Sequence, residues 1–175
     1  MRDAVKLLRI ISTLNPKYGG PSSAIIDNSL YLKSKGIKVD IITNDHKSSN
    51  FYKDNKLKVI NIGSKYLPIS FNPFLFFWIL KNKGKYNNFV IHGIWELNTL
   101  IAKLLLKKNY YVFTHGQLDP YFKSEKINIL KKKIYWFFIE KKNLINSKSL
   151  LLTSDNEKKL LNKTFVNTDG IKKTV

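Results

Sequence analysis

Two histidines, each followed by a glycine, are the side chains of this sequence best suited to chemistry. His92 ends the run Phe89-Val-Ile-His, and His115 ends the run Tyr111-Val-Phe-Thr-His. An imidazole in such a place can donate a hydrogen bond to a sugar hydroxyl or a diphosphate, or it can take a proton. The competing interpretation is that each histidine caps its own strand by bonding to nearby backbone. Because the His-Gly step occurs twice, we predict a ligand site that contains both histidines.

A carboxylate follows each of these histidines four residues later, as Glu96 and Asp119. Either could bind a substrate hydroxyl or orient a side chain, and either could equally serve as a helix-start or turn residue. We interpret Glu96 as structural and Asp119 as part of the site. The chain has no Asp-x-Asp triplet, so a carboxylate-held metal diphosphate site has no support and no metal is predicted. His46 lies in a predicted polar loop over residues 44–55 and receives no role.

A glycine pair, Gly19-Gly20, lies before Pro21, between the first predicted strand and the first predicted helix. Two glycines let backbone approach a ligand closely, and a helix N-terminus favours an anion. An ordinary turn between strand and helix explains the pair equally well. The three-glycine dinucleotide fingerprint and the Walker lysine motif are both absent, so no cofactor is predicted.

The elements that must position these residues alternate between strand and helix. This rhythm predicts an α/β fold: a single Rossmann-like, doubly wound, mainly parallel sheet of about six strands with helices on both faces. Open parallel sheets bind ligands at the carboxyl ends of their strands, which is where both histidines fall. We predict this domain over residues 1–162 and an irregular tail over residues 163–175. The predicted strands are 7–13, 38–43, 57–62, 89–92, 110–114 and 150–153, and the predicted helices are 21–35, 74–80, 97–105, 125–142 and a short one capped by Ser154.

Composition narrows the class of protein. The chain has 175 residues, of which 43% are apolar, and it has no cysteine, which excludes a disulfide scaffold and a cysteine nucleophile. Its formal net charge of +19 suggests nucleic acid or an anionic membrane as a partner, or merely an AT-rich coding sequence. No apolar run approaches the roughly 20 residues of a membrane span, and no signal peptide is evident. We expect a cytoplasmic protein that could sit peripherally at the inner face of the membrane.

A lysine-rich helix is predicted over residues 125–142. Its apolar residues form one stripe, and lysines flank that stripe. Such a helix can pack on the sheet and leave a solvated outer face. It can also rest on an anionic bilayer surface, a role that the aromatic segment 71–78 could share.

The order of these motifs resembles the N-terminal domain of family 4 retaining glycosyltransferases, which have the two-Rossmann-domain GT-B architecture. The resemblance covers roughly Leu7 to Leu161. The motifs that carry it are Gly-Gly-Pro after a strand, His-Gly-Ile-Trp, Thr-His-Gly-Gln-Leu-Asp-Pro-Tyr, a Lys-Lys-rich helix, and Leu-Leu-Thr-Ser-Asp-Asn-Glu.

The resemblance implies an acceptor-binding half of a nucleotide-sugar-dependent enzyme that makes cell-surface polysaccharide or lipid-linked glycan. Gly19 and Gly20 would face the donor diphosphate and the acceptor. His115 would be the catalytic residue, reaching the donor sugar or its leaving group, and His92 would support the same rim. Gly116 and Asp119 would complete the substrate-binding loop.

The C-terminal domain of the family, which would bind most of the nucleotide-sugar donor, has no counterpart in this sequence. The tail would then be the start of a lost inter-domain connection, and the chain would be inactive by itself. The acceptor would be a sugar or a lipid-linked sugar. The alternatives are a basic Rossmann-like module that binds nucleic acid or anionic membrane, and a non-functional fragment. Against nucleic acid, the lysines are spread over many elements and no nucleic-acid motif occurs.

Overall fold

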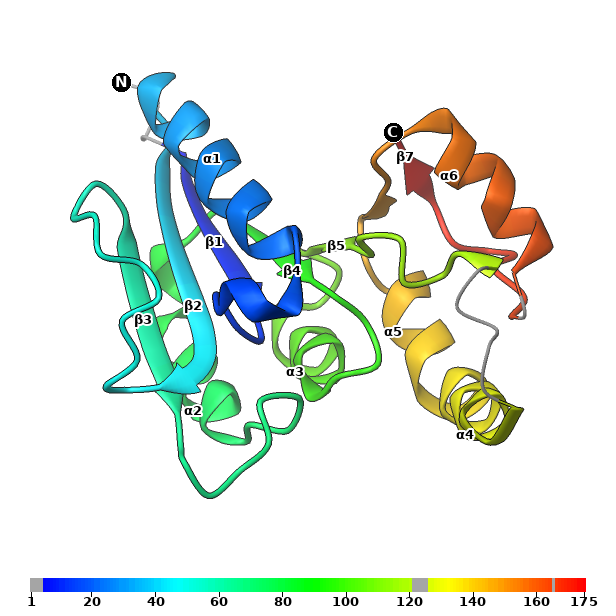
Figure 1. Cartoon of the computed structure of the whole chain (residues 1–175). Helices are drawn as coiled ribbons and strands as arrows, with labels where there is room; N and C mark the ends of the chain where they lie inside the picture. Colours follow the sequence, from blue (N-terminus) through cyan, green and yellow to red (C-terminus); the bar gives the residue numbers. More distant parts are fainter. Residues whose placement is uncertain (1–4, 121–125, 165) are drawn as a thin grey trace.

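The strands form one sheet in which every neighbouring pair runs parallel (Figure 1). The computed structural model describes residues 5–120, 126–164 and 166–175, and within these the sheet has seven strands in the order β3-β2-β1-β4-β5-β6-β7. The strands are β1 (Lys6–Ile11), β2 (Lys38–His46), β3 (Lys58–Gly63), β4 (Asn88–His92), β5 (Tyr111–Phe113), β6 (Ser149–Leu151) and β7 (Lys173–Thr174).

The central strand β1 shows why the sheet is buried on both faces. Leu8 and Ile10 point to one face and Leu7 and Ile11 to the other, and all four are at most 8% exposed. β1 pairs with β2 on one side and with β4 on the other. The doubly wound α/β fold predicted from the alternation of elements is therefore confirmed, with one strand more than expected.

Helices cover both faces of this sheet (Figure 1). Ile25 of α1 packs with Ile11 and Ile41 on one face. On the other face α2, α3 and α5 pack over the larger core that contains Ile10 and Ile91. The α-helices are α1 (Pro21–Ser34), α2 (Phe74–Asn82), α3 (Leu97–Leu106), α4 (Lys126–Tyr135), α5 (Lys141–Ile145) and α6 (Asp155–Leu160). Short 3-10 turns are η1 (Pro16–Tyr18), η2 (Lys83–Lys85) and η5 (Leu161–Lys163), and a π-helical segment η4 (Trp136–Glu140) joins α4 to α5.

The second strand ends later than the sequence predicts. The prediction of a polar loop over residues 44–55 is wrong at its start, because β2 continues to His46, and Asn44 and Asp45 are both 4% exposed. The β2–β3 register shifts between Thr43 and His46, which lets the strand continue beyond its apolar part. Both polar side chains find buried partners, so their burial carries no unpaired group.

The lysine-rich helix and the tail also differ in detail from expectation. The predicted start of that helix at residue 125 lies outside the described residues, and its described part is three joined segments, α4, η4 and α5. The tail expected to be irregular contains β7, which pairs with β6, and it buries Val166 and Ile171. The place of residues 163–175 in a longer protein stays a prediction.

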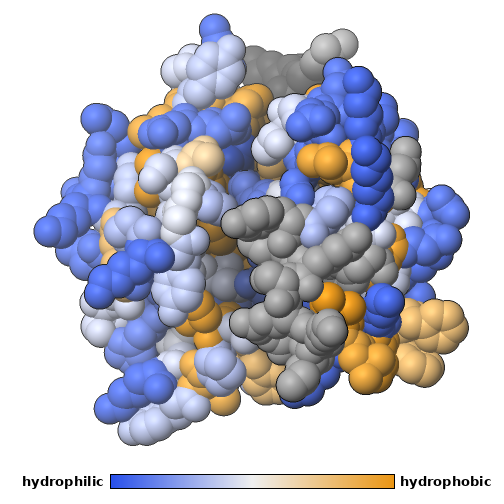
Figure 2. Space-filling view, turned by 45° about the vertical axis from the view of Figure 1, so that its right-hand side comes forward, coloured by the Kyte–Doolittle hydropathy of each residue, from blue (hydrophilic) through white to orange (hydrophobic). Residues whose placement is uncertain are grey.

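Several large apolar side chains lie exposed on the outer surface instead of in the core. Figure 2 shows an apolar patch at the lower right, in the region that α4 occupies in Figure 1, with hydrophilic side chains around it. On α2, Phe74 and Phe77 are 50% and 66% exposed, although Leu75 and Ile79 of the same helix are fully buried. Within the described ranges, no helix combines the length and the apolar character that crossing a membrane would need.

Truncation of Ile10 tests whether β1 is the centre of the core. Ile10 is fully buried, so Ile10→Ala removes apolar contacts on the face that α2 and α3 cover. We expect the free energy of unfolding, measured by urea denaturation, to fall by about 2–5 kcal/mol. Val5→Ala, at a 46% exposed position just before the strand, is the control and should change it by less than about 0.5 kcal/mol. Equal losses in the two variants would contradict this packing.

Candidate functional site

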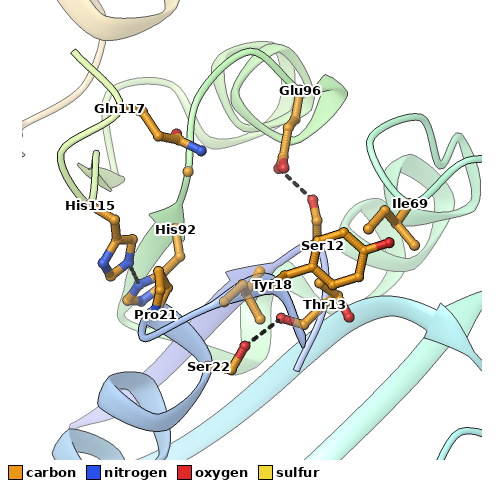
Figure 3. A pocket seen from close by; sticks show the side chains of 12 residues that line it. Ser12, Thr13, Tyr18, Pro21, Ser22, Ile69, His92, Glu96, His115 and Gln117 are labelled. Atoms are coloured by element: carbon orange, nitrogen blue, oxygen red, sulfur yellow. Dashed lines mark hydrogen bonds between the residues drawn. The ribbon is translucent and has the colours of Figure 1, made fainter. Parts of the chain in front are cut away.

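A pocket of about 170 Å³ opens at the carboxyl edge of the sheet, between the ends of β1 and β4 (Figure 3). The strand order reverses at this point, because β1 leads to β2 on one side whereas β4 lies on the other. Open α/β sheets bind ligands in the crevice that such a reversal creates. The lining residues are Ile11, Ser12, Thr13, Tyr18, Pro21, Ser22, Ile69, His92, Gly93, Glu96, His115 and Gln117.

The two histidines meet in this pocket. His92 Nδ1 and His115 Nε2 are 2.9 Å apart and share a hydrogen bond, and the ring centroids lie 5.1 Å apart in a stacked arrangement (Figure 3). Phe113 stacks against His115 with centroids 4.5 Å apart. Both histidines therefore lie together at the carboxyl edge of the sheet, and their role in ligand binding stays a prediction. Their competing role as simple strand caps does not account for an imidazole–imidazole bond.

Both imidazoles are held in the neutral form. Burial lowers the pKa of His92 well below its ordinary value, and the positive charge of Arg9 and the neighbouring His115 lower it further. Burial also lowers the pKa of His115, and this effect together with Arg9 outweighs the opposing charge of Glu157. A neutral imidazole donates one hydrogen bond and accepts another, so the pair can bind hydroxyl or phosphate oxygens without carrying charge.

Arg9 supplies a positive charge near the pair, since it lines a second pocket together with both histidines. Its guanidinium donates to the Ile25 carbonyl at 3.3 Å and to the Asn28 side chain. Arg9 is 7% exposed, and burial lowers its pKa to about 10, so it remains charged at neutral pH. Neither ion pair among the described residues involves Arg9. Its charge is therefore not cancelled by a carboxylate among the described residues, and it lowers the pKa of both histidines.

Glu96 faces the pocket from the loop before α3. It occupies the N-cap position of that helix, yet its side chain makes no capping bond. Instead its carboxylate accepts hydrogen bonds from Ser12 Oγ and, at 3.1 Å, from Asn98 Nδ2. The structural role that we assigned to Glu96 from sequence thus does not take the form of a helix cap.

A chain of buried amides holds Glu96 and Ser12 in place. Asn72 Nδ2 donates to Asn44 Oδ1 and Asn44 Nδ2 donates to Asn98 Oδ1, each at 3.1 Å. Asn98 Nδ2 in turn donates to Ser12 Oγ at 3.0 Å. Because each amide uses both its donor and its acceptor, the relay fixes the orientation of every member and therefore of the carboxylate at its end.

Burial makes this carboxylate a weak acid. It raises the pKa of Glu96 to about 7, against the opposing hydrogen bonds from Ser12 and Asn98. A second carboxyl, Glu140, lies behind it on η4, where burial raises its pKa to about 8 and Thr99 Oγ1 donates to it at 3.1 Å. Near neutral pH the pocket carboxyl is partly protonated, so it can donate to a ligand oxygen as well as accept from a hydroxyl.

The loop that carries His115 is fastened by Glu157. Its Oε1 accepts from Thr114 Oγ1 at 2.9 Å and from the Gly116 amide at 3.2 Å, and its Oε2 accepts from the Thr153 amide and hydroxyl at 2.7 Å. His115 and Gly116 both have left-handed backbone, with φ of 50° and 77°. Such a conformation is strained for histidine and persists only where the surroundings impose it.

Gln117 joins this loop to the other His-Gly step. Its Oε1 accepts from the Ile94 amide at 2.6 Å, next to Gly93, whose φ is 94°. A Cβ added to Gly93 would lie 3.6 Å from both Gln117 Oε1 and Glu96 Oε2, inside the pocket. The glycine is thus needed for its backbone angle, and it also keeps the pocket open.

The other predicted site residues lie around this pocket rather than in its wall. Gly19 and Gly20 are exposed and fall between Tyr18 and Pro21, which do line it. Gly116 gives its amide to Glu157. Asp119, which we expected to bind substrate, does not line the pocket, and its amide donates to the Gly116 carbonyl at 2.7 Å. The role of each in substrate binding stays a prediction.

Sequence reasoning missed the residues that shape the pocket from β1 and β2. Asp45 accepts from Thr13 Oγ1 and, at 2.8 Å, from the Leu14 amide, and so fixes the turn that leads to Tyr18. Ser12, Asn98 and Gln117 were also missed. Polar residues at the ends of apolar strands were the available signal, but sequence cannot show which of them face one another. Among the described residues, no three His, Cys, Asp or Glu side chains gather as metal ligands would.

Comparison with solved structures shows where this fold is used. The chain matches sucrose-phosphate synthase from Thermosynechococcus elongatus at a TM-score of 0.58 and 16% identity, covering 97% of this chain and 47% of that one. It matches a glycosyltransferase from Rickettsia africae at 0.58 and 18%, covering 98% and 42%. It matches UDP-N-acetylglucosamine 2-epimerase from Rickettsia bellii at 0.52 and 9%, covering 97% and 44%. No protein-family model and no curated protein matched the chain.

These matches define a glycosyltransferase-like Rossmann fold. At such low identity they show the shared fold alone, and the chain spans just under half the length of each matched structure. Nearly all of this chain is covered in each case, so the whole sheet, rather than a fragment of it, corresponds to one part of those larger proteins.

Removal of the Glu157 carboxylate should loosen the His115 loop. Burial alone would raise the pKa of Glu157, but the hydrogen bonds from Thr153, Thr114 and Gly116 lower it below its ordinary value. Its stabilisation is therefore present above the unfolded pKa and is lost as pH falls through the lower folded pKa. We expect Glu157→Ala to cost about 1–3 kcal/mol at pH 7 in denaturant titrations, and less at pH 3. The exposed neighbour Asp155, as Asp155→Asn, should show neither effect.

The carboxyl groups behind the pocket should titrate far from the usual range. The chain has four glutamates, so ¹³C-glutamate labelling gives a spectrum simple enough to assign with Glu96→Gln. We expect midpoints near 7 for Glu96 and near 8 for Glu140. Because folding raises these pKa values, stability should fall as pH rises from about 5 to 8, and less steeply in Glu96→Gln. A Glu96 midpoint near 4.5 would show that the pocket is open to water.

Proposed function

We propose that this chain is the acceptor-binding half of a nucleotide-sugar-dependent retaining glycosyltransferase that builds cell-surface polysaccharide or lipid-linked glycan. The observation that carries the proposal is the meeting of His92, His115 and Glu96 around one pocket at the reversal of strand order. The glycosyltransferase-like fold supports it. The length of the matched structures is consistent with a second unit that would hold most of the donor.

The pocket chemistry fits a carbohydrate better than a metal or a nucleophilic reaction. Its polar groups are two neutral imidazoles, a partly protonated carboxyl and hydroxyls such as that of Ser12. Together these groups offer both hydrogen-bond donors and acceptors, which matches the donor and acceptor character of sugar hydroxyls. Tyr18 adds a ring, 66% exposed, at the rim, where it can cover an apolar sugar face.

In this proposal the protein positions groups rather than shuttling protons. In a retaining transfer the leaving diphosphate oxygen takes the proton of the acceptor hydroxyl, so no protein base is required. His115 would donate its N–H to the donor sugar or the leaving group, with His92 fixing its ring through the shared hydrogen bond. Glu96 would bind an acceptor hydroxyl. Orientation of two reactants in a dry pocket supplies most of the catalysis in such a scheme.

Ligand binding by the purified chain tests whether it binds a saccharide but does not transfer sugar by itself. We expect millimolar saccharides to shift the imidazole NMR signals of His92 and His115, and nucleotide-sugars to show no turnover. His115→Ala should abolish the saccharide-induced shift at His92, whereas His46→Ala, at an exposed histidine outside the pocket, should leave it unchanged. Steady transfer or hydrolysis of a nucleotide-sugar by this chain alone would refute the proposed half-site.

The DNA that follows codon 175 offers a second test. An open reading frame for another Rossmann unit, in this frame or a shifted one, would supply the donor side, and adding that unit should restore transfer. If the added unit binds donor but no transfer occurs with the wild-type chain, the acceptor role is wrong.

A further inference from the structure

The outer face of the α4–η4–α5 segment is apolar, and its large side chains are not covered by any part of the chain that the structure describes. Leu130, Ile134, Phe137 and Phe138 are 63%, 53%, 70% and 64% exposed. They follow one another at spacings of four, three and one, so they share one side of the helix. We call these four residues the apolar stripe; Figure 2 shows the patch in this region.

The opposite side of the same segment is firmly buried. Trp136, Glu140 and Leu144 recur every four residues and are at most 4% exposed. A four-residue repeat would drift around an α-helix of 3.6 residues per turn, and the wider turn of the π-helical η4 absorbs that drift. The stripe therefore cannot be buried by rotating the segment, because the opposite side of the segment is already packed in the core.

The charged side chains that residues 130–145 expose beside the stripe are all positive. Lys131, Lys133 and Lys142 are exposed beside it, and the only acidic residue between positions 130 and 145 is Glu140, which is fully buried. Neither ion pair found among the described residues, Lys6–Asp40 or Lys56–Asp54, involves this segment. Within this segment, an apolar centre flanked by lysines is left facing outward.

An apolar stripe flanked by lysines favours some binding partners over others. A second copy would bring the lysine rims face to face, which like-charge repulsion opposes. Nucleic acid would meet the lysines but gain little from Leu130, Ile134 and two phenylalanines. An anionic bilayer satisfies both parts, since Phe and Leu side chains bury at the headgroup boundary while lysines meet lipid phosphates. We propose that the outer face of α4–η4–α5 docks in the plane of an anionic lipid surface.

Docking there would place the pocket at the membrane. Trp95, next to Glu96, packs against Tyr135 and Trp136 with centroids 6.3 and 5.8 Å apart. The Tyr135 hydroxyl donates to the Glu96 carbonyl at 3.3 Å. The docking segment and the pocket loop are thus in direct contact. The next step rests on the proposed function. If that function holds, the acceptor is an amphiphile whose sugar reaches the pocket from the lipid surface.

Vesicle binding by the full chain tests the docking face without any sugar. Vesicles of phosphatidylcholine alone are compared with vesicles that contain about a third phosphatidylglycerol, by co-sedimentation at low and at physiological salt. We expect binding only to the anionic vesicles. The double variant Phe137→Ser/Phe138→Ser should weaken it tenfold or more, and Lys131→Gln/Lys133→Gln/Lys142→Gln should do the same.

Matched control variants distinguish binding through this face from nonspecific effects of net charge and exposed aromatic rings. Tyr31→Ser/Tyr66→Ser removes two aromatic rings that are 60% and 82% exposed elsewhere, and Lys38→Gln/Lys58→Gln/Lys163→Gln removes the same charge elsewhere. Both should bind like the wild type. Equal weakening in the lysine control, absence of binding to anionic vesicles, or self-association that the Phe137/Phe138 substitutions abolish would overturn the proposal. Failure of saccharide binding would leave these results unchanged and would count against the proposed function alone.

Discussion

The parallel pairing of β1 with β2 on one side and β4 on the other is the constraint on which the rest of the structure depends. From β1 the chain passes through α1 on one face of the sheet, and it returns to β4 through α2 on the other. The loops after β1 and β4 must therefore separate at the carboxyl edge. The pocket is a consequence of that separation, and its lining residues decide only what it can bind.

Burial then sets the chemistry of the pocket. Burial lowers the pKa of both imidazoles, and the guanidinium of Arg9, which has no carboxylate partner among the described residues, lowers it further. The same burial leaves Glu96 partly protonated. Of the two roles that the sequence allowed for the histidines, hydrogen bonding and proton uptake, the buried neutral pair favours hydrogen bonding. Such a pair suits the positioning of a polyhydroxylated ligand.

One segment connects this pocket to the outer surface. Through Tyr135 and Trp136 the α4–η4–α5 segment supports the loop of Glu96, and its other side presents the apolar stripe. The π-helical turn makes both possible, because it keeps the buried side and the exposed apolar stripe in register along one helix. The site and the proposed docking face therefore depend on the same segment, which in this proposal would tie recognition of an acceptor to the surface from which it comes.

The sequence by itself determined the alternation of elements and the placing of both histidines at strand ends, because apolar periodicity and glycine are local signals. It did not determine that Asn44 and Asp45 are buried, that Glu96 faces the pocket, or that Asp119 does not line it. Those outcomes rest on contacts between residues far apart in the chain, such as the relay from Asn72 to Ser12. Only the tertiary structure decides them, because an amide or carboxylate acquires its environment from the partners that the fold brings to it.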